Sequence, residues 1–316
     1  MKIFNNIDDF KAKNPVVTVG TFDGVHLGHQ KIFNHVKSLA DKLGGESVVF
    51  TFWPHPRMVL DPKADKVSMI NSIEEKIELI EYQGIDNLII IPFTKEFSEL
   101  SYCDFIEKFL HQKIKMKGLI VGYDHKFGHD REGNFDKLKN CTDKYNSKIE
   151  KVEALSVEGV NISSTIVRKK ILDGNIETAN KYLSRIFSIK GKVVEGKKIG
   201  RNLGFPTANI KIQESYKIIP KNGVYAVDVE YENKKYYGML NIGFRPTLNE
   251  ENQTQSIETH IFSFYHNIYD SCLKINFHRR IRAEMKFKNI EELKTQLFND
   301  KIKVEQYFKI KENTLK

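Results

Sequence analysis

The sequence lacks long hydrophobic runs, an apolar N-terminal segment and any cluster of cysteines. No apolar stretch approaches the ~20 residues that a helix needs to cross a bilayer, so we expect no membrane partner. The opening residues, MKIFNNIDDFKAKNP, contain no apolar core or small-residue cleavage site, which predicts no signal peptide and a cytoplasmic location. Cys103, Cys141 and Cys272 are far apart and odd in number, so we expect neither a disulfide framework nor a zinc site.

Further absences concern the partners of the protein. The chain has no internal repeat, and its 50 Lys and Arg residues form no arginine-rich block or basic helix face. The net charge of +9 suits polyanionic small molecules such as nucleotides as well as nucleic acids. Because the lysines are mixed with acidic residues, we interpret the charge as a solvated basic surface and expect no nucleic-acid partner. The hydrophobic content of 40% is sufficient for packed cores.

Strand-like and helix-like segments alternate in the first half of the chain. Apolar runs of strand length are separated by amphipathic patterns with a helical period. The expected strands are residues 14–20, 47–52, 87–93, 118–123 and 148–155. This order is typical of a doubly wound parallel sheet with helices on both faces, and ligands of such sheets lie at the carboxyl ends of the strands. Two short helices are expected to follow at 163–174 and 176–183.

The pattern changes at Phe187. Segments with a period of two, rich in β-branched and aromatic residues, occur at 187–196, 223–243, 256–264 and 272–282. They predict an antiparallel sheet or a small closed barrel, and the amphipathic segment 289–308 predicts a terminal helix. We therefore expect two domains of an α/β protein, a parallel-sheet domain at 1–185 and an antiparallel β-domain at 186–316.

Glycines and two histidines lie between a predicted strand and a predicted helix in the segment 16–33, VVTVGTFDGVHLGHQKIF. Glycines let the backbone approach a ligand, and the first turn of a helix offers free N–H groups to an anion. His26 and His29 are one helical turn apart, so both imidazoles can face one phosphate group. The spacing is not GxGxxG and gives no support for a Rossmann dinucleotide site. From these residues alone, metal binding and a plain polar loop remain alternatives.

Two other segments contain residues suited to phosphates. In ISSTIVRKK, Ser163 or Ser164 can cap a helix and Arg168 follows one turn later, although a simple N-cap would have the same pattern. In GKVVEGKKIGRNLGFPTANI, a glycine-rich basic loop can close over phosphates through backbone N–H groups. Thr207 and Asn209 offer neutral oxygens for a Mg²⁺ held mainly by phosphate oxygens, and a glycine-rich hairpin without a ligand is the alternative.

The motifs GTFDGVHLGHQ, TFWPHP, VGYDHKFG and ISSTIVR together resemble the FMN adenylyltransferase module of bifunctional riboflavin kinase/FAD synthetases, a nucleotidyltransferase domain. The resemblance implies that His26 and His29 are catalytic and stabilise charge on the ATP phosphates, and that His55 and Arg57 lie near the flavin or the phosphates. It also implies a set of nucleotide-binding residues: Gly20, Phe22, Asp23, Asp124, Ser163, Ser164, Thr165 and Arg168. The sequence departs from the family at His125, where an aromatic residue is usual.

The motifs GRNLGFPTAN, GVYAV, NIGFRPT, SIETHIF and RIRAEMKF resemble, in that order, the riboflavin kinase module of the same family, a β-barrel with a terminal helix. The resemblance implies that Glu258 is the catalytic base and that Thr207 and Asn209 hold Mg²⁺. It implies further nucleotide-binding residues, Gly191, Lys197, Gly200 and Gly204, and further flavin-binding residues, Arg279, Arg282 and Glu284. Phe244 replaces an expected threonine.

Taken together, the motifs predict a bifunctional transferase with ATP, riboflavin and FMN as substrates and Mg²⁺ as cofactor. We expect small-molecule partners only and a monomer or weak homo-oligomer. Three alternatives remain: another adenylyl acceptor for the first module, a chain in which one module is inactive, and a basic barrel that binds nucleic acid.

Overall fold

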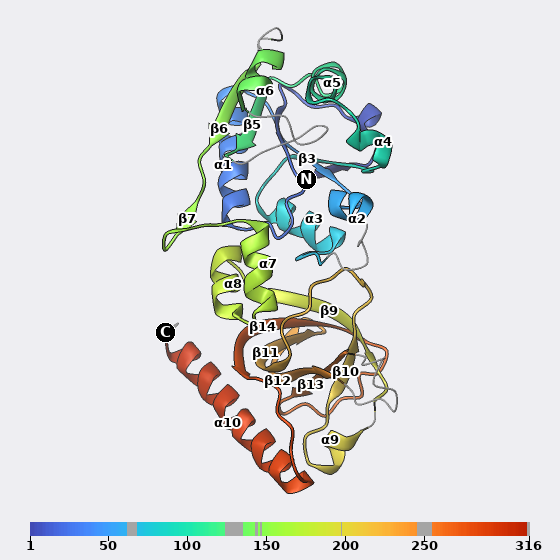
Figure 1. Ribbon diagram of the computed structural model, residues 1–316, viewed down its shortest axis with the longest axis vertical. Helices are drawn as coiled ribbons and strands as arrows, with labels where there is room; N and C mark the ends of the chain where they lie inside the picture. Colours follow the sequence, from blue (N-terminus) through green and yellow to red (C-terminus); the bar gives the residue numbers. More distant parts are fainter. Residues whose placement is uncertain are drawn as a thin grey trace. The chain divides into compact units, whose positions relative to one another are not determined.

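The computed structural model of the protein describes residues 1–61, 68–123, 135–142, 145, 147–196, 198–244 and 255–314. The chain divides into two compact units, Met1–Val167 and Arg168–Lys316 (Figure 1). The predicted domain boundary between residues 185 and 186 stays a prediction, because this division rests on compactness alone.

The first unit contains a parallel sheet, as the alternating pattern predicts. Its strands are β1 (Lys2–Phe4), β2 (Val16–Val19), β3 (Ser47–Phe52), β4 (Asn87–Ile91), β5 (Gly118–Gly122) and β6 (Lys148–Val152). They are ordered β1-β4-β3-β2-β5-β6, and every neighbouring pair is parallel. The chain fills one side of β2 with β3 and β4 and then crosses to the other side with β5. A topological switch point therefore lies at the carboxyl end of β2.

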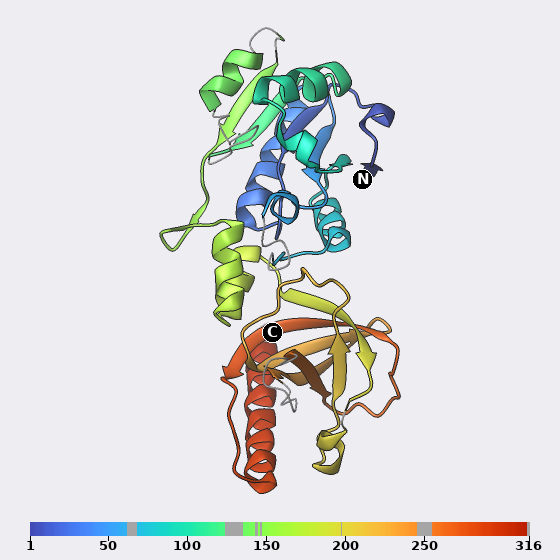
Figure 2. The same ribbon diagram turned by 45° about the vertical axis from the view of Figure 1, so that its right-hand side comes forward.

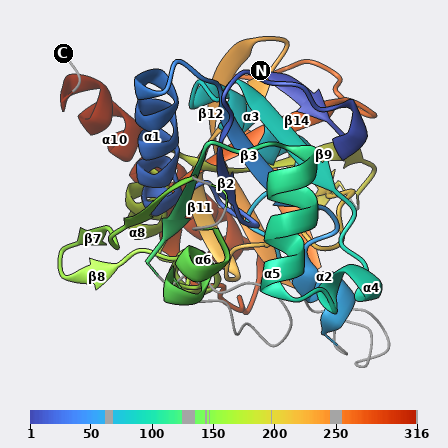
Figure 3. The same cartoon turned by 90° about the horizontal axis from the view of Figure 1, so that it is seen from above.

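Helices cover both faces of this sheet. On one face are α1 (Leu27–Lys42) and α3 (Ile73–Tyr82), and on the other are α5 (Tyr102–Phe105) and the π-helical segment η3 (Ile106–Lys113) (Figure 3). Because strand side chains alternate, Val49 packs with the first pair of helices and Phe50 with the second. The other elements of the unit are η1 (Ile7–Asp9), α2 (Pro56–Leu60), α4 (Lys95–Ser98), α6 (Phe135–Thr142) and the hairpin strands β7 (Ser156–Val157) and β8 (Val160–Asn161).

One cysteine expectation is wrong. Cys103 of α5 and Cys141 of α6 form a disulfide, with their Cα atoms 5.8 Å apart. The two residues are 38 positions apart in the chain, but α5 and α6 pack together, and sequence spacing does not report that proximity. Cys272 is a free, exposed cysteine.

The second unit contains a closed antiparallel barrel, one of the two architectures that the sequence pattern left open. Its strands are β9 (Phe187–Val194), β10 (Ala208–Lys211), β11 (Gly223–Tyr231), β12 (Lys234–Phe244), β13 (Gln255–Ile261) and β14 (Cys272–Arg282). They close in the order β10-β13-β12-β11-β14-β9. The helices are α7 (Ser164–Leu172), which spans the border of the units, then α8 (Ile176–Leu183), α9 (Ile199–Asn202) and α10 (Ile290–Thr314).

The terminal helix α10 runs beside the barrel and covers part of its outer face (Figure 2). Period-two alternation separates the two faces of each strand. Tyr225 and Phe277 point into the barrel, where their rings lie 5.4 Å apart. Their outward-facing neighbours pack under α10, where Val224 and Ala226 contact the helix residue Val304.

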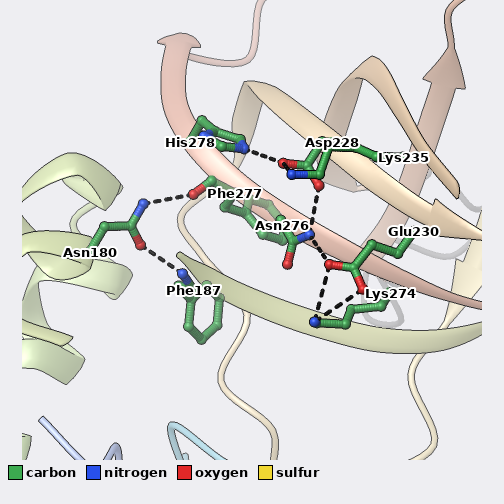
Figure 4. A network of polar contacts seen from close by, with 9 residues as sticks. All are labelled: Asn180, Phe187, Asp228, Glu230, Lys235, Lys274, Asn276, Phe277 and His278. Carbon is green, nitrogen blue, oxygen red and sulfur yellow. Dashed lines mark hydrogen bonds and ion pairs between the residues drawn. The ribbon is translucent and has the colours of Figure 1, made fainter. Parts of the chain in front are cut away.

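Two groups of polar contacts hold this unit together, one between α8 and the strands β9 and β14, the other between β11 and β14 (Figure 4). The Asn180 side chain donates to the Phe277 carbonyl at 2.8 Å and accepts the Phe187 N–H at 2.7 Å. Asp228 accepts hydrogen bonds from His278 and Asn276. Burial alone would raise the pKa of Asp228, but these hydrogen bonds outweigh it, so the pKa lies below its ordinary value. Asn180 therefore anchors α8 to β9 and β14, and Asp228 links β11 to β14.

Candidate active sites

The first candidate site lies where β2 ends and α1 begins. His26 is the N-cap of α1, and its Nδ1 accepts the His29 backbone N–H at 3.4 Å. The two imidazoles are stacked with their centroids 3.6 Å apart, and the Phe22 ring meets His29 edge-on at 5.2 Å. The structure thus brings together the histidine pair of the sequence motif at a helix N-terminus, which favours anions.

The turn before α1 is held in an unusual conformation. Phe22, Gly24 and Val25 all have positive φ angles, of 48°, 90° and 39°, which are costly for residues with side chains. A Cβ on Gly20 would lie 2.9 Å from the Phe22 ring, so Gly20 leaves room for that ring. The buried Asp23 carboxylate accepts the N–H groups of Ile70 and Asn71 at 3.0–3.2 Å. Asp23 therefore ties the turn to the backbone at Ile70 and Asn71.

The start of α7 joins this turn. Ser163 precedes the helix and its Oγ accepts the Ile166 N–H at 3.4 Å, so Ser163 is the capping serine. Ser164 Oγ donates to the Asp23 carbonyl at 2.8 Å. Thr165 is exposed and Arg168, one turn later, is half-buried. Among the hydroxyl groups of the predicted phosphate clamp, that of Ser164 thus contacts the turn that carries Asp23.

His55 and Arg57 differ in their surroundings. His55 is buried, caps the short helix α2, and accepts the Arg57 N–H on its Nδ1 at 3.1 Å. The Arg57 side chain is exposed near the carboxyl end of β3. His55 therefore has a local structural partner, and its contact with a flavin stays a prediction.

Lys76 is a residue of this unit that sequence reasoning missed, because a lysine in an amphipathic helix normally faces solvent. In α3 it is only 2% exposed, and its Nζ has no hydrogen-bond partner among the described residues. It lies 5.6 Å from the centre of the Trp53 ring. Burial lowers the pKa of Lys76 to about 8, while the charge of Asp23 acts in the opposite direction.

We expect Lys76→Met to stabilise the first unit at pH 7 by about 3 kcal/mol, because methionine fills a similar space without a desolvated charge. Below about pH 8 both the folded and the unfolded chain carry the lysine proton, so the buried charge of Lys76 destabilises the folded state by its full amount. This destabilisation shrinks as the pH rises from about 8 to 10.5, since only the unfolded chain then holds the proton. Urea unfolding followed by the fluorescence of Trp53, the single tryptophan, measures the difference.

The matched control is Lys42→Met on α1, where the lysine is exposed and the change should stay within about 0.5 kcal/mol. A gain for Lys76→Met that does not vary between pH 7 and 10 would contradict the assignment of the penalty to the buried charge.

The second candidate site lies on the outer face of the barrel where β10 and β13 pair. Asn209 of β10 is directly opposite Glu258 of β13. Thr207 Oγ1 donates to Glu258 Oε2 at 3.4 Å. Asn209 is buried, whereas Thr207 and Glu258 are half-buried. The three residues that the motifs PTAN and IETH suggested are thus adjacent, although Glu258 is 49 positions after Asn209 in the chain.

The glycine-rich loop packs against these residues. A Cβ on Gly196 would lie 2.1 Å from the Asn209 side-chain nitrogen, so only glycine lets the loop lie against that amide. Gly191 is in β9 against β10, and Gly200 lies in α9, where its carbonyl accepts the Phe205 N–H at 2.8 Å. Gly204 has a φ of +81° in the turn that follows α9. The loop therefore supports Asn209 and folds back just before Thr207.

The predicted flavin residues in β14 and just after it have partners of their own. Arg282 forms a bidentate pair with Asp300 of α10, with nitrogen–oxygen distances of 2.8–3.0 Å. Arg279 pairs with Glu177 of α8 at 3.5 Å. Glu284 is exposed and accepts a hydrogen bond from Asn222 at 3.3 Å. The Arg282 pair anchors α10, so for this residue a flavin contact stays a prediction.

Two residues beside the second site carried no signal of their own in the sequence. Asn241 of β12 is opposite Glu258 on the side away from Asn209, so the three form one row across three strands. His260 of β13 is buried, and its Nδ1 lies 2.8 Å from the Pro206 carbonyl oxygen. Burial lowers the pKa of His260, the bond to Pro206 opposes this, and the charge of Lys301 adds to the lowering. The motifs NIGFRPT and SIETHIF contain the two residues, and only the strand register shows where they face.

The structure does not test the expectations for four positions. Asp124 and Lys197 lie outside the described residues, as does His125. Phe244 ends β12 and is 48% exposed. Nothing in the structure explains the substitution of Phe244 for threonine.

The donor set of the second site suits Mg²⁺ better than a metal held by the protein alone. Thr207 and Asn209 provide neutral oxygens and Glu258 provides one carboxylate. Within the described ranges, no group of three or more His, Cys, Asp or Glu side chains is arranged to hold a metal ion. Such a set fits Mg²⁺, which keeps water ligands and binds chiefly through nucleotide phosphates.

Two family models match the chain, one in each half. The FAD synthetase model matches residues 9–166 and the riboflavin kinase model matches residues 183–308. The chain is 37% identical to the bifunctional riboflavin kinase/FMN adenylyltransferase of Buchnera aphidicola over 99% of its length and 100% of that protein. The enzyme of the same description from Bacillus subtilis is also 37% identical, over 96% of this chain and 95% of its own.

The Escherichia coli protein of that description is 32% identical, with 96% of each chain covered. A crystal structure described as a macrolide-efflux protein from Streptococcus pneumoniae has a TM-score of 0.86 and 32% identity over 95% of this chain and 96% of its own. Among the described helices, none combines the length and hydropathy of a membrane span.

The parallel-sheet unit and the barrel thus define a two-module transferase. The chain belongs to the family of bifunctional riboflavin kinase/FMN adenylyltransferases.

Proposed function

We propose that the second unit phosphorylates riboflavin, in keeping with the kinase activity of the family, and that Glu258 is its base. The carboxylate accepts the proton of the ribityl 5′-hydroxyl, whose oxygen then forms a bond to the γ-phosphorus of ATP while the bond to ADP breaks. Thr207 and Asn209 hold Mg²⁺, which neutralises charge on the phosphates when bound. This assignment is supported by the position of Asn209 directly opposite Glu258 and by the hydrogen bond that Thr207 donates to the Glu258 carboxylate.

The first unit converts FMN to FAD. An oxygen of the FMN phosphate bonds to the α-phosphorus of a second ATP, and the bond to pyrophosphate breaks. We assign to His26 and His29 the stabilisation of the negative charge that accumulates on the phosphates, because the two imidazoles are stacked at the N-terminus of α1. Ser163, which precedes α7, and Ser164, Thr165 and Arg168 of α7 bind the phosphates. This reaction needs alignment and charge stabilisation more than acid–base catalysis.

The single observation that carries the two-activity conclusion is the match of a different family model to each half of the chain. The test mixes the purified protein with riboflavin, ATP and Mg²⁺ and separates the flavins by chromatography. We expect both FMN and FAD. FMN alone would overturn the adenylyl-transfer assignment, and the absence of both products would overturn the proposal.

Three properties accompany this function as proposals. The enzyme works in the cytoplasm, binds small molecules rather than nucleic acid or membranes, and is a monomer or weak homo-oligomer. The mixing of lysines with acidic residues supports the absence of a nucleic-acid surface. A salt-dependent shift of RNA by the purified protein would contradict it.

A further inference from the structure

His260 connects β13 to the segment that carries Thr207. His260 is 8% exposed and lies two residues after Glu258, so both side chains leave the same face of β13. A carbonyl oxygen only accepts hydrogen bonds, so the ring nitrogen 2.8 Å from the Pro206 oxygen carries the proton. Phe205 and Phe262 pack edge-on or tilted against the ring, with centroids 5.3 and 5.6 Å away. The imidazole is thus fixed in orientation as well as in position.

The backbone pairing of β10 with β13 begins at Ala208, opposite Thr259. Thr207 and Pro206 precede that ladder, and Pro206 has no N–H to donate. The His260 side chain bonds the Pro206 carbonyl at the point where the ladder ends, and so extends the attachment of this segment to β13. Thr207 is then held from two directions, through the preceding carbonyl by His260 and through its hydroxyl by Glu258.

We propose that His260 is a positioning residue of phosphoryl transfer, which fixes the Pro206–Thr207 peptide so that the Thr207 hydroxyl faces the phosphates and Glu258. The proposal rests on the assignment of riboflavin phosphorylation to this unit. His260 does not touch the reacting atoms. It acts through the backbone that carries Thr207, and the distance between that hydroxyl and Glu258 is the quantity it controls.

The test compares His260→Leu with His260→Asn in the full-length chain. Leucine keeps apolar bulk but has no donor, whereas the asparagine amide nitrogen can occupy the place of Nδ1. We expect His260→Leu to lower kcat for FMN formation about tenfold or more, with the KM for riboflavin nearly unchanged. His260→Asn should restore most of the loss. FAD formation from supplied FMN should be unchanged in both variants, which shows that the first unit is folded and that the effect is confined to the barrel.

A second readout does not depend on activity. Hydrogen–deuterium exchange of the ligand-free protein, measured by mass spectrometry on peptides covering 203–209, reports the mobility of the segment directly. Exchange should be faster in His260→Leu, confined to these peptides, and close to the original in His260→Asn. The matched control His266→Leu, at an exposed histidine after β13, should change neither kcat nor exchange.

Three outcomes would overturn the proposal: normal kcat in His260→Leu, unchanged exchange at 203–209, or equal losses in both variants with faster exchange across the whole barrel. If His260→Leu does not fold, His260→Gln takes its place, because its amide nitrogen corresponds to Nε2 and points away from Pro206. Failure of the original protein to make FMN would instead refute the proposed function and leave the exchange result to decide the role of His260 in the fold.

Discussion

Replacing Glu258 by glutamine should reduce the conversion of riboflavin to FMN by at least about a hundredfold, while supplied FMN is still converted to FAD. Glutamine has nearly the same shape and retains an oxygen for the Thr207 hydroxyl, which lies 3.4 Å from the carboxylate. It cannot accept the proton of the ribityl hydroxyl. The change therefore removes the base with little effect on the geometry, and the loss should fall on kcat rather than on the KM for riboflavin.

The measurement is a pair of assays on one protein, riboflavin to FMN and FMN to FAD. Glu230→Gln is the matched control, since Glu230 is also on the outside of the barrel but binds Lys274 and Asn276. It should leave both rates unchanged. If Glu258→Gln keeps more than a tenth of the FMN rate, or if both rates fall together, Glu258 is not the base of a separate kinase site.

The sequence predicted the long elements of both units well, because their patterns are strong. The buried runs at β2, β3 and β4 and the terminal helix α10 agree with the structure. Strand β1 was missed because Lys2–Phe4 is too short to show a period and exists through its pairing with β4. Strand β10 was missed because it follows Pro206 within a glycine-rich loop, and its neighbours β9 and β13 determine its conformation.

For the sites, the sequence supplied residue types but not their partners. It placed His26 and His29 at a helix start, where local spacing is informative. It could not show that Asp23 binds the backbone at Ile70, 47 positions away. The pairing of Arg282 with Asp300 likewise depends on how α10 packs against β14, and no periodic pattern encodes that contact.

Replacing His29 by alanine, or His26 by asparagine, should slow FAD formation from FMN by about a hundredfold or more and leave FMN formation from riboflavin unchanged. The two changes test the same charge stabilisation in different ways. His26 is also the N-cap of α1, so His26→Ala would combine lost charge stabilisation with lost helix stability. Asparagine is among the best N-caps and keeps an acceptor for the His29 N–H, so His26→Asn removes the imidazole alone.

Stability and activity should therefore separate in His26→Asn. Its urea midpoint, followed by Trp53 fluorescence, should match that of the original protein while FAD formation is lost. The control His35→Asn, at an exposed histidine of the same helix, should be normal in both measurements.

If His26→Asn makes FAD at the original rate, the stacked pair serves only to start α1. If His29→Ala instead lowers FMN and FAD formation equally, the two sites are not independent. The first result would remove His26 from the chemistry and the second would refute a separate adenylyl-transfer site, whereas selective loss of FAD would place the developing negative charge at the N-terminus of α1.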